Sequence, residues 1–242
     1  VRRADSAVDL HGNGAAAYLD MEAIVAAALA EGCDALHPGY GFLSENARFA
    51  AMCAEASITF VGPRPETLAL FDDKAAARRH AEAQGVPVLA GISRAVSLED
   101  VRDFMRDGVR VRPVMLKALA GGGGRGMRAV ETLDELEAAY ERCRSEALKA
   151  FGAGDLYVEE LIGRARHVEI QVIGDGTQVS HLWDRECSIQ RQRQKLLEIA
   201  PAFGLPPAVR GAMLEAAVQL ARAAGYAGLG TFEFLVDAGE GA

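Results

Sequence analysis

A strand-like segment that runs into four consecutive glycines constrains this chain of 242 residues more than any other feature. The apolar segment begins at Pro113, carries Lys117, and leads into Gly121–Gly124. Glycines lack a Cβ and accept positive φ, so their N–H groups can approach a polyanion closely. The spacing matches neither a Walker loop nor GxGxxG. The segment predicts a phosphate cradle, with a flexible surface loop as the alternative.

Alternation along this strand places Met115, Lys117 and Leu119 on one face. A buried ammonium is costly unless it is paired, and a phosphate from a ligand would supply the partner. The alternative is a lysine whose ammonium reaches water along its aliphatic stem.

Bulk properties exclude several classes of protein. The composition is 50% hydrophobic and 25% charged, which is ordinary for a globular chain, and the net charge of −8 argues against non-specific binding to nucleic acid or anionic membranes. No segment approaches the roughly 20 apolar residues of a membrane span. The four cysteines form no CxxC pair, which favours a reduced, cytoplasmic protein.

The order of predicted elements is first α/β and then α+β. Helical patterns at 21–30 and 47–56 alternate with short apolar runs at 34–37 and 58–61, and two further helices meet near 72–74. Four domains are expected: a partial N-terminal lobe at 1–61, a helical connector at 62–88, a subdomain with the glycine loop at 89–161, and a sheet-rich part at 162–242.

Local signals sharpen these boundaries. Ser97–Asp100 and Thr132–Glu135 are typical of helix starts, and the second has the composition of a capping box. The turn at 174–176 predicts a hairpin between two strands, and Pro206 and Pro207 open a long helix that ends at Gly225.

Polar residues stand where a core face is expected. In the strand 167–173, His167, Glu169 and Gln171 alternate with apolar residues, which indicates either a sheet with one face in water or the floor of a ligand cleft. Glu233 lies in an otherwise apolar strand, where a carboxylate needs a cation. Magnesium and an arginine satisfy that need equally well.

The densest polar run, 184–198, lies between two strand-like segments. Arg191, Arg193 and Lys195 occupy alternate positions, so an extended backbone would direct all three cations to the same side. A solvated loop is the ordinary interpretation of such a run. In an acidic protein, the local positive face indicates an anion site.

Together these segments resemble the biotin carboxylase family of the ATP-grasp fold. Four segments carry the resemblance along nearly the whole chain: 37–46, 117–127, 166–172, and 185–201. The resemblance implies an ATP-grasp fold preceded by part of a Rossmann-like N-terminal lobe, with the family's sequence incomplete at both ends.

The resemblance also implies a reaction, in which ATP, bicarbonate and a biotinyl carrier give ADP, phosphate and the carboxylated carrier. The cofactors would be ATP and magnesium or manganese, with biotin as the carrier-bound substrate. A biotinyl carrier and a carboxyltransferase are the expected partners, neither nucleic acid nor a membrane is expected, and the full-length protein would be an oligomer. It would belong to an acyl-CoA, pyruvate or urea carboxylase.

Roles for individual residues follow from the resemblance. Lys195 would bind bicarbonate as the catalytic cation, Glu233 would be the first magnesium ligand, and Tyr40 and Gly41 would lie near biotin. The expected ATP-binding residues are Lys74, Lys117, Gly123, Gly124, Met127, Glu159, Glu160, Leu161, Ile162, His167, Gln190, Arg193 and Glu233.

Two departures from the family pattern affect these expectations. Arg193 replaces the usual His or Asn, and an arginine is bulkier and permanently charged. The chain also ends soon after Glu233, so we expect the 242 residues to bind MgATP weakly without turnover. The alternatives are a different ATP-grasp ligase and a non-catalytic nucleotide-binding module.

Overall fold

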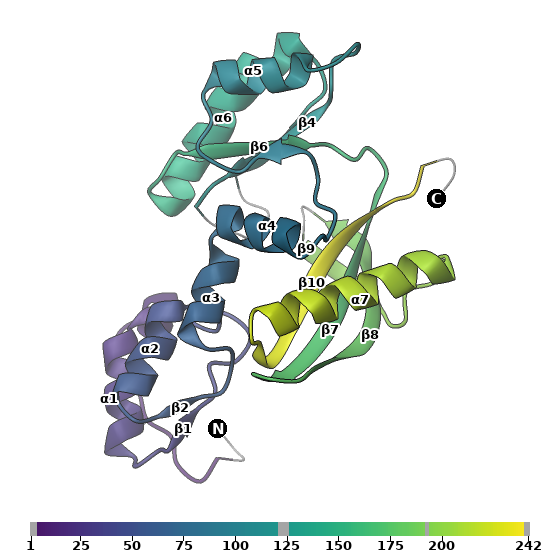
Figure 1. The fold of residues 1–242 in the computed structure, drawn as a ribbon. Coiled ribbons are helices and arrows are strands. Elements are labelled where there is room, and N and C mark those ends of the chain that lie inside the picture. Colours follow the sequence, from purple (N-terminus) through teal and green to yellow (C-terminus); the bar gives the residue numbers. More distant parts are fainter. Residues whose placement is uncertain (1–3, 121–125, 192–193, 240–242) are drawn as a thin grey trace. The chain divides into compact units, whose positions relative to one another are not determined.

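The structure is a computed structural model that describes residues 4–120, 126–191 and 194–239. Figure 1 traces the element order through two compact units. The first unit contains the chain up to Asp73 together with Val172–Ser180 and Ala221–Gly230, and the second contains the remainder. Among the described helices, none combines the length and apolar character that a membrane crossing requires.

The first unit has the α/β order that the sequence predicts. Its elements from the first 73 residues are the 3-10 helix η1 (Gly14–Leu19), α1 (Met21–Ala30), β1 (Ala35–Leu36), α2 (Ala47–Glu55), β2 (Thr59–Phe60) and α3 (Pro65–Asp72). Strands β1 and β2 pair in parallel, as α/β order requires. Asp20 and Asn46 cap α1 and α2 through their side chains, which accept from Ala23 N and Phe49 N.

The core of this unit is small and apolar. Val25, Phe49, Cys53 and Ile58 are buried together, and the Phe49 ring meets the Phe60 ring edge to face at 6.0 Å between centroids. These residues come from α1, α2 and the entry to β2, so the core holds the helices against the parallel strand pair.

The second unit begins with a helix and an antiparallel sheet. Its elements here are α4 (Lys74–Ala83), β3 (Gly91–Ile92), α5 (Leu98–Arg106), β4 (Val114–Ala118), β5 (Met127–Val130), α6 (Leu133–Phe151) and β6 (Leu156–Glu160). The strand order is β3-β6-β4-β5, and every adjacent pair is antiparallel. The capping box predicted at Thr132 is present, and the predicted helix start at Ser97 also forms one.

One face of this sheet carries the largest core of the protein. Leu116, Val130 and Val158 pack with residues of α5 and α6, among them Met105 and Leu136, all with 0% exposure. Since strand side chains alternate between faces, Lys117 and Glu159 lie on the opposite face. The predicted strand around Lys117 is therefore confirmed, together with its alternation.

A glycine is required where the chain enters β5. Gly126 has φ of +62°, and a Cβ added there would lie 3.0 Å from the Ala118 Cβ. Its carbonyl accepts from Ala118 N at 2.7 Å. Gly121–Gly124 lie outside the described residues, so their predicted phosphate-binding role stays a prediction.

A second sheet, most of whose residues belong to the second unit, has the strand order β10-β7-β8-β9. Its elements, with the long helix that precedes the last strand, are β7 (Ala165–Asp175), β8 (Val179–Arg191), β9 (Gln194–Ile199), α7 (Pro207–Ala223) and β10 (Ala227–Asp237). The predicted hairpin between β7 and β8 and the predicted start of α7 are confirmed. Helix α4 contacts α7, where the His80 ring lies 3.0 Å from the Leu220 carbonyl oxygen.

The interpretation of 184–198 as one extended run is wrong. Strand β8 continues to Arg191, and β9 begins at Gln194, so this segment is a hairpin. Gln190 pairs with Lys195, and Arg191 pairs with Gln194. Paired residues share a face, so Arg191 and Lys195 lie on opposite faces of the sheet. Arg193 lies outside the described residues.

The predicted domain boundaries at 61, 88 and 161 stay predictions. The two compact units divide between Asp73 and Lys74, which separates α3 from α4 within the expected connector.

The core of the first sheet provides a direct test of stability. Leu136→Ala should lower the free energy of unfolding by about 2–5 kcal/mol, because it leaves a cavity under a fully buried side chain. Leu148→Ala on the same helix is the matched control, since Leu148 is 56% exposed and should change stability little. Urea denaturation measures both, and equal effects would contradict the described packing.

Candidate functional site

A buried carboxylate on β7 organises the most polar part of the second sheet. The Glu169 side chain is only 1% exposed, yet Arg185 Nη2 donates to its Oε2 at 2.7 Å and Lys195 Nζ pairs with its Oε1. Burying a carboxylate without partners is costly, and these two cations offset that cost. The polar face predicted for β7 is therefore covered, and the sheet is not simply open to water on that side.

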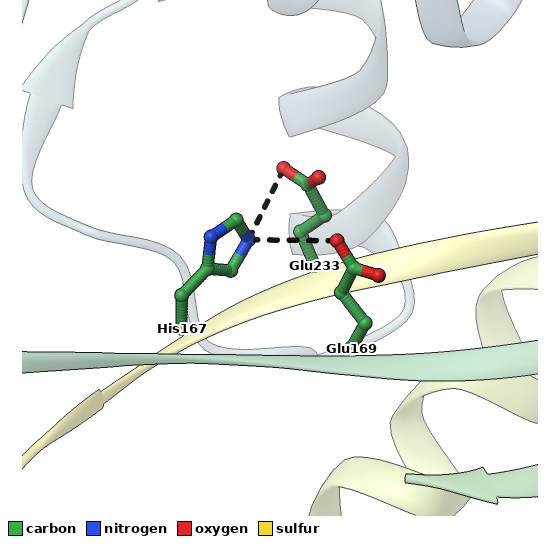
Figure 2. Close-up of side chains that lie close together, drawn as sticks. All are labelled: His167, Glu169 and Glu233. Atoms are coloured by element: carbon green, nitrogen blue, oxygen red, sulfur yellow. Dashed lines mark ion pairs between the residues drawn. The ribbon is translucent and has the colours of Figure 1, made fainter. Parts of the chain in front are cut away.

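Glu233 on β10 completes the cluster. Its Oε2 lies 3.4 Å from His167 Nε2, and its Oε1 lies 3.5 Å from Lys195 Nζ. Figure 2 shows His167, Glu169 and Glu233 pointing toward one another, with His167 Nε2 also 4.0 Å from Glu169. Lys195 thus bridges a buried carboxylate and an outer one.

The expectation that Glu233 needs a cation is met by Lys195 rather than by an arginine, and its apolar neighbours do not enclose the carboxylate. The side chain is 58% exposed, because strand alternation turns it away from the partly buried Phe232 and Phe234. Its partners among the described residues are His167 and Lys195, one at each oxygen. The exposure of the carboxylate leaves it accessible to a ligand from the solvent side.

A glutamine orients the histidine. Gln190 Nε2 donates to the Cys187 carbonyl at 2.9 Å and lies 2.8 Å from His167 Nδ1. An amide nitrogen is only a donor, so Nδ1 acts as the acceptor in this arrangement. In that tautomer Nε2 carries the proton and faces Glu233 as a donor.

A second buried carboxylate, that of Glu186, supports the part of β7 that carries His167. Glu186 accepts from Arg166 Nε at 3.1 Å and from the Ser188 hydroxyl, and His167 N donates to that same hydroxyl oxygen at 2.8 Å. Burial raises the pKa of Glu186, but the hydrogen bonds from Ser188 and Arg166 outweigh burial, and its pKa lies below the ordinary value. This network fixes the backbone that carries His167.

The predicted phosphate-binding lysines lie on or beside the first sheet of the same unit. Lys117 Nζ forms an ion pair with the Glu159 carboxylate and lies 6.0 Å from the centroid of the Tyr157 ring. Lys74, the first residue of α4, donates to the Leu119 carbonyl at 3.2 Å. Lys117 does have the charged partner that alternation predicted, and in this structure the chain itself supplies it.

The predicted adenine-binding edge is partly engaged in the sheet. Glu160 N donates to Ala90 O at 2.8 Å, and Leu161 N donates to Pro113 O at 3.0 Å. For Ile162 N, the described part of the chain supplies no acceptor. Within this segment, the Ile162 N–H is therefore the main-chain donor that is available to a ligand.

The remaining predicted site residues are dispersed. Met127 begins β5 directly opposite Lys117, and Gly123, Gly124 and Arg193 lie outside the described residues. Tyr40 and Gly41 belong to the first unit, in a turn where Gly39 N donates to His37 Nδ1 at 3.0 Å. The Tyr40 side chain is fully exposed, and Phe42 next to Gly41 adopts φ of +50°.

The side chains of His167, Glu169 and Glu233 offer a partial set of ligand atoms for a hard cation. One ligand atom each from His167, Glu169 and Glu233 lies within 4.8 Å of the others. Lys195 already neutralises Glu169 and one oxygen of Glu233. The exposed carboxylate of Glu233 fits Mg²⁺, which takes one or two carboxylates together with substrate phosphates.

Two family models match this chain. The ATP-binding domain of the carbamoyl-phosphate synthase L chain matches residues 73–242, and the N-terminal domain of biotin carboxylase matches residues 1–68. The chain belongs to the biotin carboxylase family. Its ATP-grasp domain is the part that carries Glu169, Lys195 and Glu233.

Individual relatives agree with this assignment. Pyruvate carboxylase of Bacillus subtilis is 49% identical over 91% of this chain and 19% of its own length, and biotin carboxylase of Nostoc sp. is 45% identical over 98% of this chain and 53% of its own. The biotin carboxylase domain of Hydrogenobacter thermophilus 2-oxoglutarate carboxylase, solved with MgADP, ADP and bicarbonate, superimposes with a TM-score of 0.91 at 43% identity, covering 98% of this chain and 52% of that one. The chain thus spans about half or less of these relatives.

The predicted ATP-grasp fold and biotin carboxylase membership are confirmed, but the sequence did not single out three important side chains. Glu169 was recognised only as part of a polar face, Arg185 only as part of a polar run, and the Glu159 side chain not at all. A useful signal for Glu169 would have been its position between Val168 and Ile170, both fully buried, with two cations nearby on the following hairpin.

Acid titration tests the geometry around Glu233. The hydrogen bond from His167 lowers the pKa of Glu233 most, burial opposes this, and the charge of Lys195 lowers it further. A folded pKa below the unfolded value of about 4.3 means that this group stabilises the fold above that pH and loses its contribution as pH falls through the folded pKa.

The measurement is an NMR titration of the Glu233 carboxyl carbon. His167→Ala should raise the pKa of Glu233 more than Lys195→Ala does, because the histidine hydrogen bond has the larger effect. A larger rise in Lys195→Ala would contradict this order.

Proposed function

We propose that the protein carries out the ATP-dependent carboxylation of biotin on a carrier, with bicarbonate as the carbon source. Membership of the biotin carboxylase family supports this reaction class. The observation that carries the proposal is the position of Lys195, whose ammonium lies between Glu169 and Glu233 on one face of the sheet. That arrangement offers an anion-binding cation directly beside a metal-binding carboxylate.

The proposed roles are as follows. Lys74 and Lys117 neutralise nucleotide phosphates, the main-chain groups of Glu159–Ile162 bind the base, and His167 with Gln190 contact the ribose side. Met127 lies beside the phosphates, and Gly123, Gly124 and Arg193, which lie outside the described residues, would complete the ATP-binding set. Phosphoryl transfer depends mainly on positioning and charge neutralisation, so such a set of groups is sufficient for it.

Bicarbonate is held by Lys195 in this proposal. An oxygen of bicarbonate attacks the γ-phosphorus of ATP, the bond from that phosphorus to the bridging oxygen breaks, and ADP leaves. The product is carboxyphosphate, whose carboxyl group then passes to a ureido nitrogen of biotin as phosphate departs and takes up the proton from that nitrogen. Glu233 would hold Mg²⁺ or Mn²⁺, which neutralises charge on the phosphates.

Fewer residues of this chain are assigned to biotin than to ATP. Tyr40 and Gly41 are proposed to lie near biotin. A biotinyl carrier and a carboxyltransferase are the proposed partners, in an oligomeric protein that binds neither nucleic acid nor a membrane. The similar proteins include pyruvate and acyl-CoA carboxylases of several domains. A cytoplasmic location is also proposed, because the sequence has no CxxC pair.

Release of ADP by the full-length protein, measured with and without bicarbonate and free biotin, tests the function. Bicarbonate should be required, and biotin should stimulate the rate. Lys195→Ala should lower the bicarbonate-dependent rate by about 10²-fold, the scale of losing one preorganised electrostatic contact. Lys149→Ala is the control, because Lys149 is exposed on α6, away from the proposed site.

The outcomes separate the candidate functions. ATP cleavage that responds to neither bicarbonate nor biotin would favour another ATP-grasp ligase, and nucleotide binding without cleavage would favour a non-catalytic module.

A further inference from the structure

The phosphate-binding lysine has an internal counter-ion. Lys117 and Glu159 form an ion pair on the polar face of the first sheet, with side-chain exposures of 20% and 14%. Lys117 lies opposite Tyr157, and Met115 lies opposite Glu159, so the two charged residues are diagonal neighbours on antiparallel strands. The strand register itself therefore brings the carboxylate to the ammonium.

The residues around Lys117 limit the positions that its ammonium can take. The opposite face of β4 consists of Val114, Leu116 and Ala118, which are 0–4% exposed in the main core. Tyr157 is also largely buried on the polar face. Lys117 therefore has two options: to remain with Glu159, or to turn toward a ligand that approaches the same face.

The carboxylate also acts electrostatically on its neighbours. Burial raises the pKa of Tyr157 most, and the charge of Glu159 raises it further, whereas Arg78 lowers it. Arg78 is itself paired with Glu82 at 3.0 Å on α4. The negative field of Glu159 thus extends over the face on which Lys117 would meet a phosphate.

We propose that Glu159 is an intramolecular counter-ion that the nucleotide polyphosphate displaces from Lys117, and that its carboxylate thereby lowers the affinity for nucleotides. The inference rests on the proposed role of Lys117 in binding nucleotide phosphates. A partly buried ion pair is screened less than a surface pair, so breaking it subtracts from the free energy of binding.

This arrangement has two consequences for a nucleotide site. In the ligand-free protein the pair offsets the cost of keeping an ammonium mostly out of water. After reaction, Glu159 can take Lys117 back as ADP leaves, so the same carboxylate that weakens binding assists release.

The test is calorimetric binding to the full-length protein and its Glu159→Gln variant, with MgADP, inorganic tripolyphosphate and adenosine as separate ligands. Glu159→Gln should lower Kd for MgADP and tripolyphosphate by on the order of tenfold, since a carboxylate no longer competes with the phosphate for the Lys117 ammonium. Adenosine has no phosphate, so its Kd should not change. Glu137→Gln is the control for net charge, because Glu137 is exposed on α6.

A double-mutant comparison keeps the test independent of small effects on folding. In a Lys117→Gln background, Glu159→Gln should no longer tighten polyphosphate binding, because the contested cation is absent. Tightening that persists there would overturn the proposal.

The remaining outcomes are distinguishable. Wild-type binding of MgADP with unchanged or weaker binding by Glu159→Gln would overturn the counter-ion role alone and would make Glu159 a residue that positions Lys117. Failure of the wild type to bind MgADP and tripolyphosphate would overturn the proposed function and this inference together.

Discussion

The buried carboxylate of Glu169 is the constraint on which the site depends. A carboxylate with 1% exposure requires positive charge within hydrogen-bonding distance, and Arg185 and Lys195 supply it from β8 and β9. Arg185 on β8 also pairs with Glu198 on β9, with its Nε 2.9 Å from the Glu198 carboxylate, so both strands of the hairpin contribute to this group of ion pairs. Once those cations are held, Lys195 is directed toward Glu233, and the proposed bicarbonate-binding cation has a defined position.

The two sheets of the second unit use the same physical solution. Each has an apolar face at the core and a polar face that carries a lysine paired with a glutamate, Lys117 with Glu159 on the first and Lys195 with Glu169 on the second. Pairing offsets the cost of holding both ammonium groups largely out of water. A ligand with negative charge then meets cations that are already positioned, at the cost of displacing or sharing their partners.

Sequence patterns predicted most of the local structure. Alternation identified the buried face of β7, the capping residues identified the starts of α5 and α6, and the turn composition identified the β7–β8 hairpin. The prediction failed at 184–198, because this stretch is divided between the antiparallel strands β8 and β9, and the alternation of one strand cannot be extended into the next. The exposure of Glu233 was also missed, since an apolar composition does not reveal which face of a strand is covered.

The sequence by itself determined the family, the order of elements and the residue types that an ATP-grasp site needs, because these depend on local periodicity and on motifs that are contiguous in the chain. Only the tertiary structure decided which charges meet. Glu169 and Lys195 are 26 positions apart, and Lys117 and Glu159 come from separate strands. Such pairings depend on strand register and burial, and both arise from long-range packing that no single segment encodes.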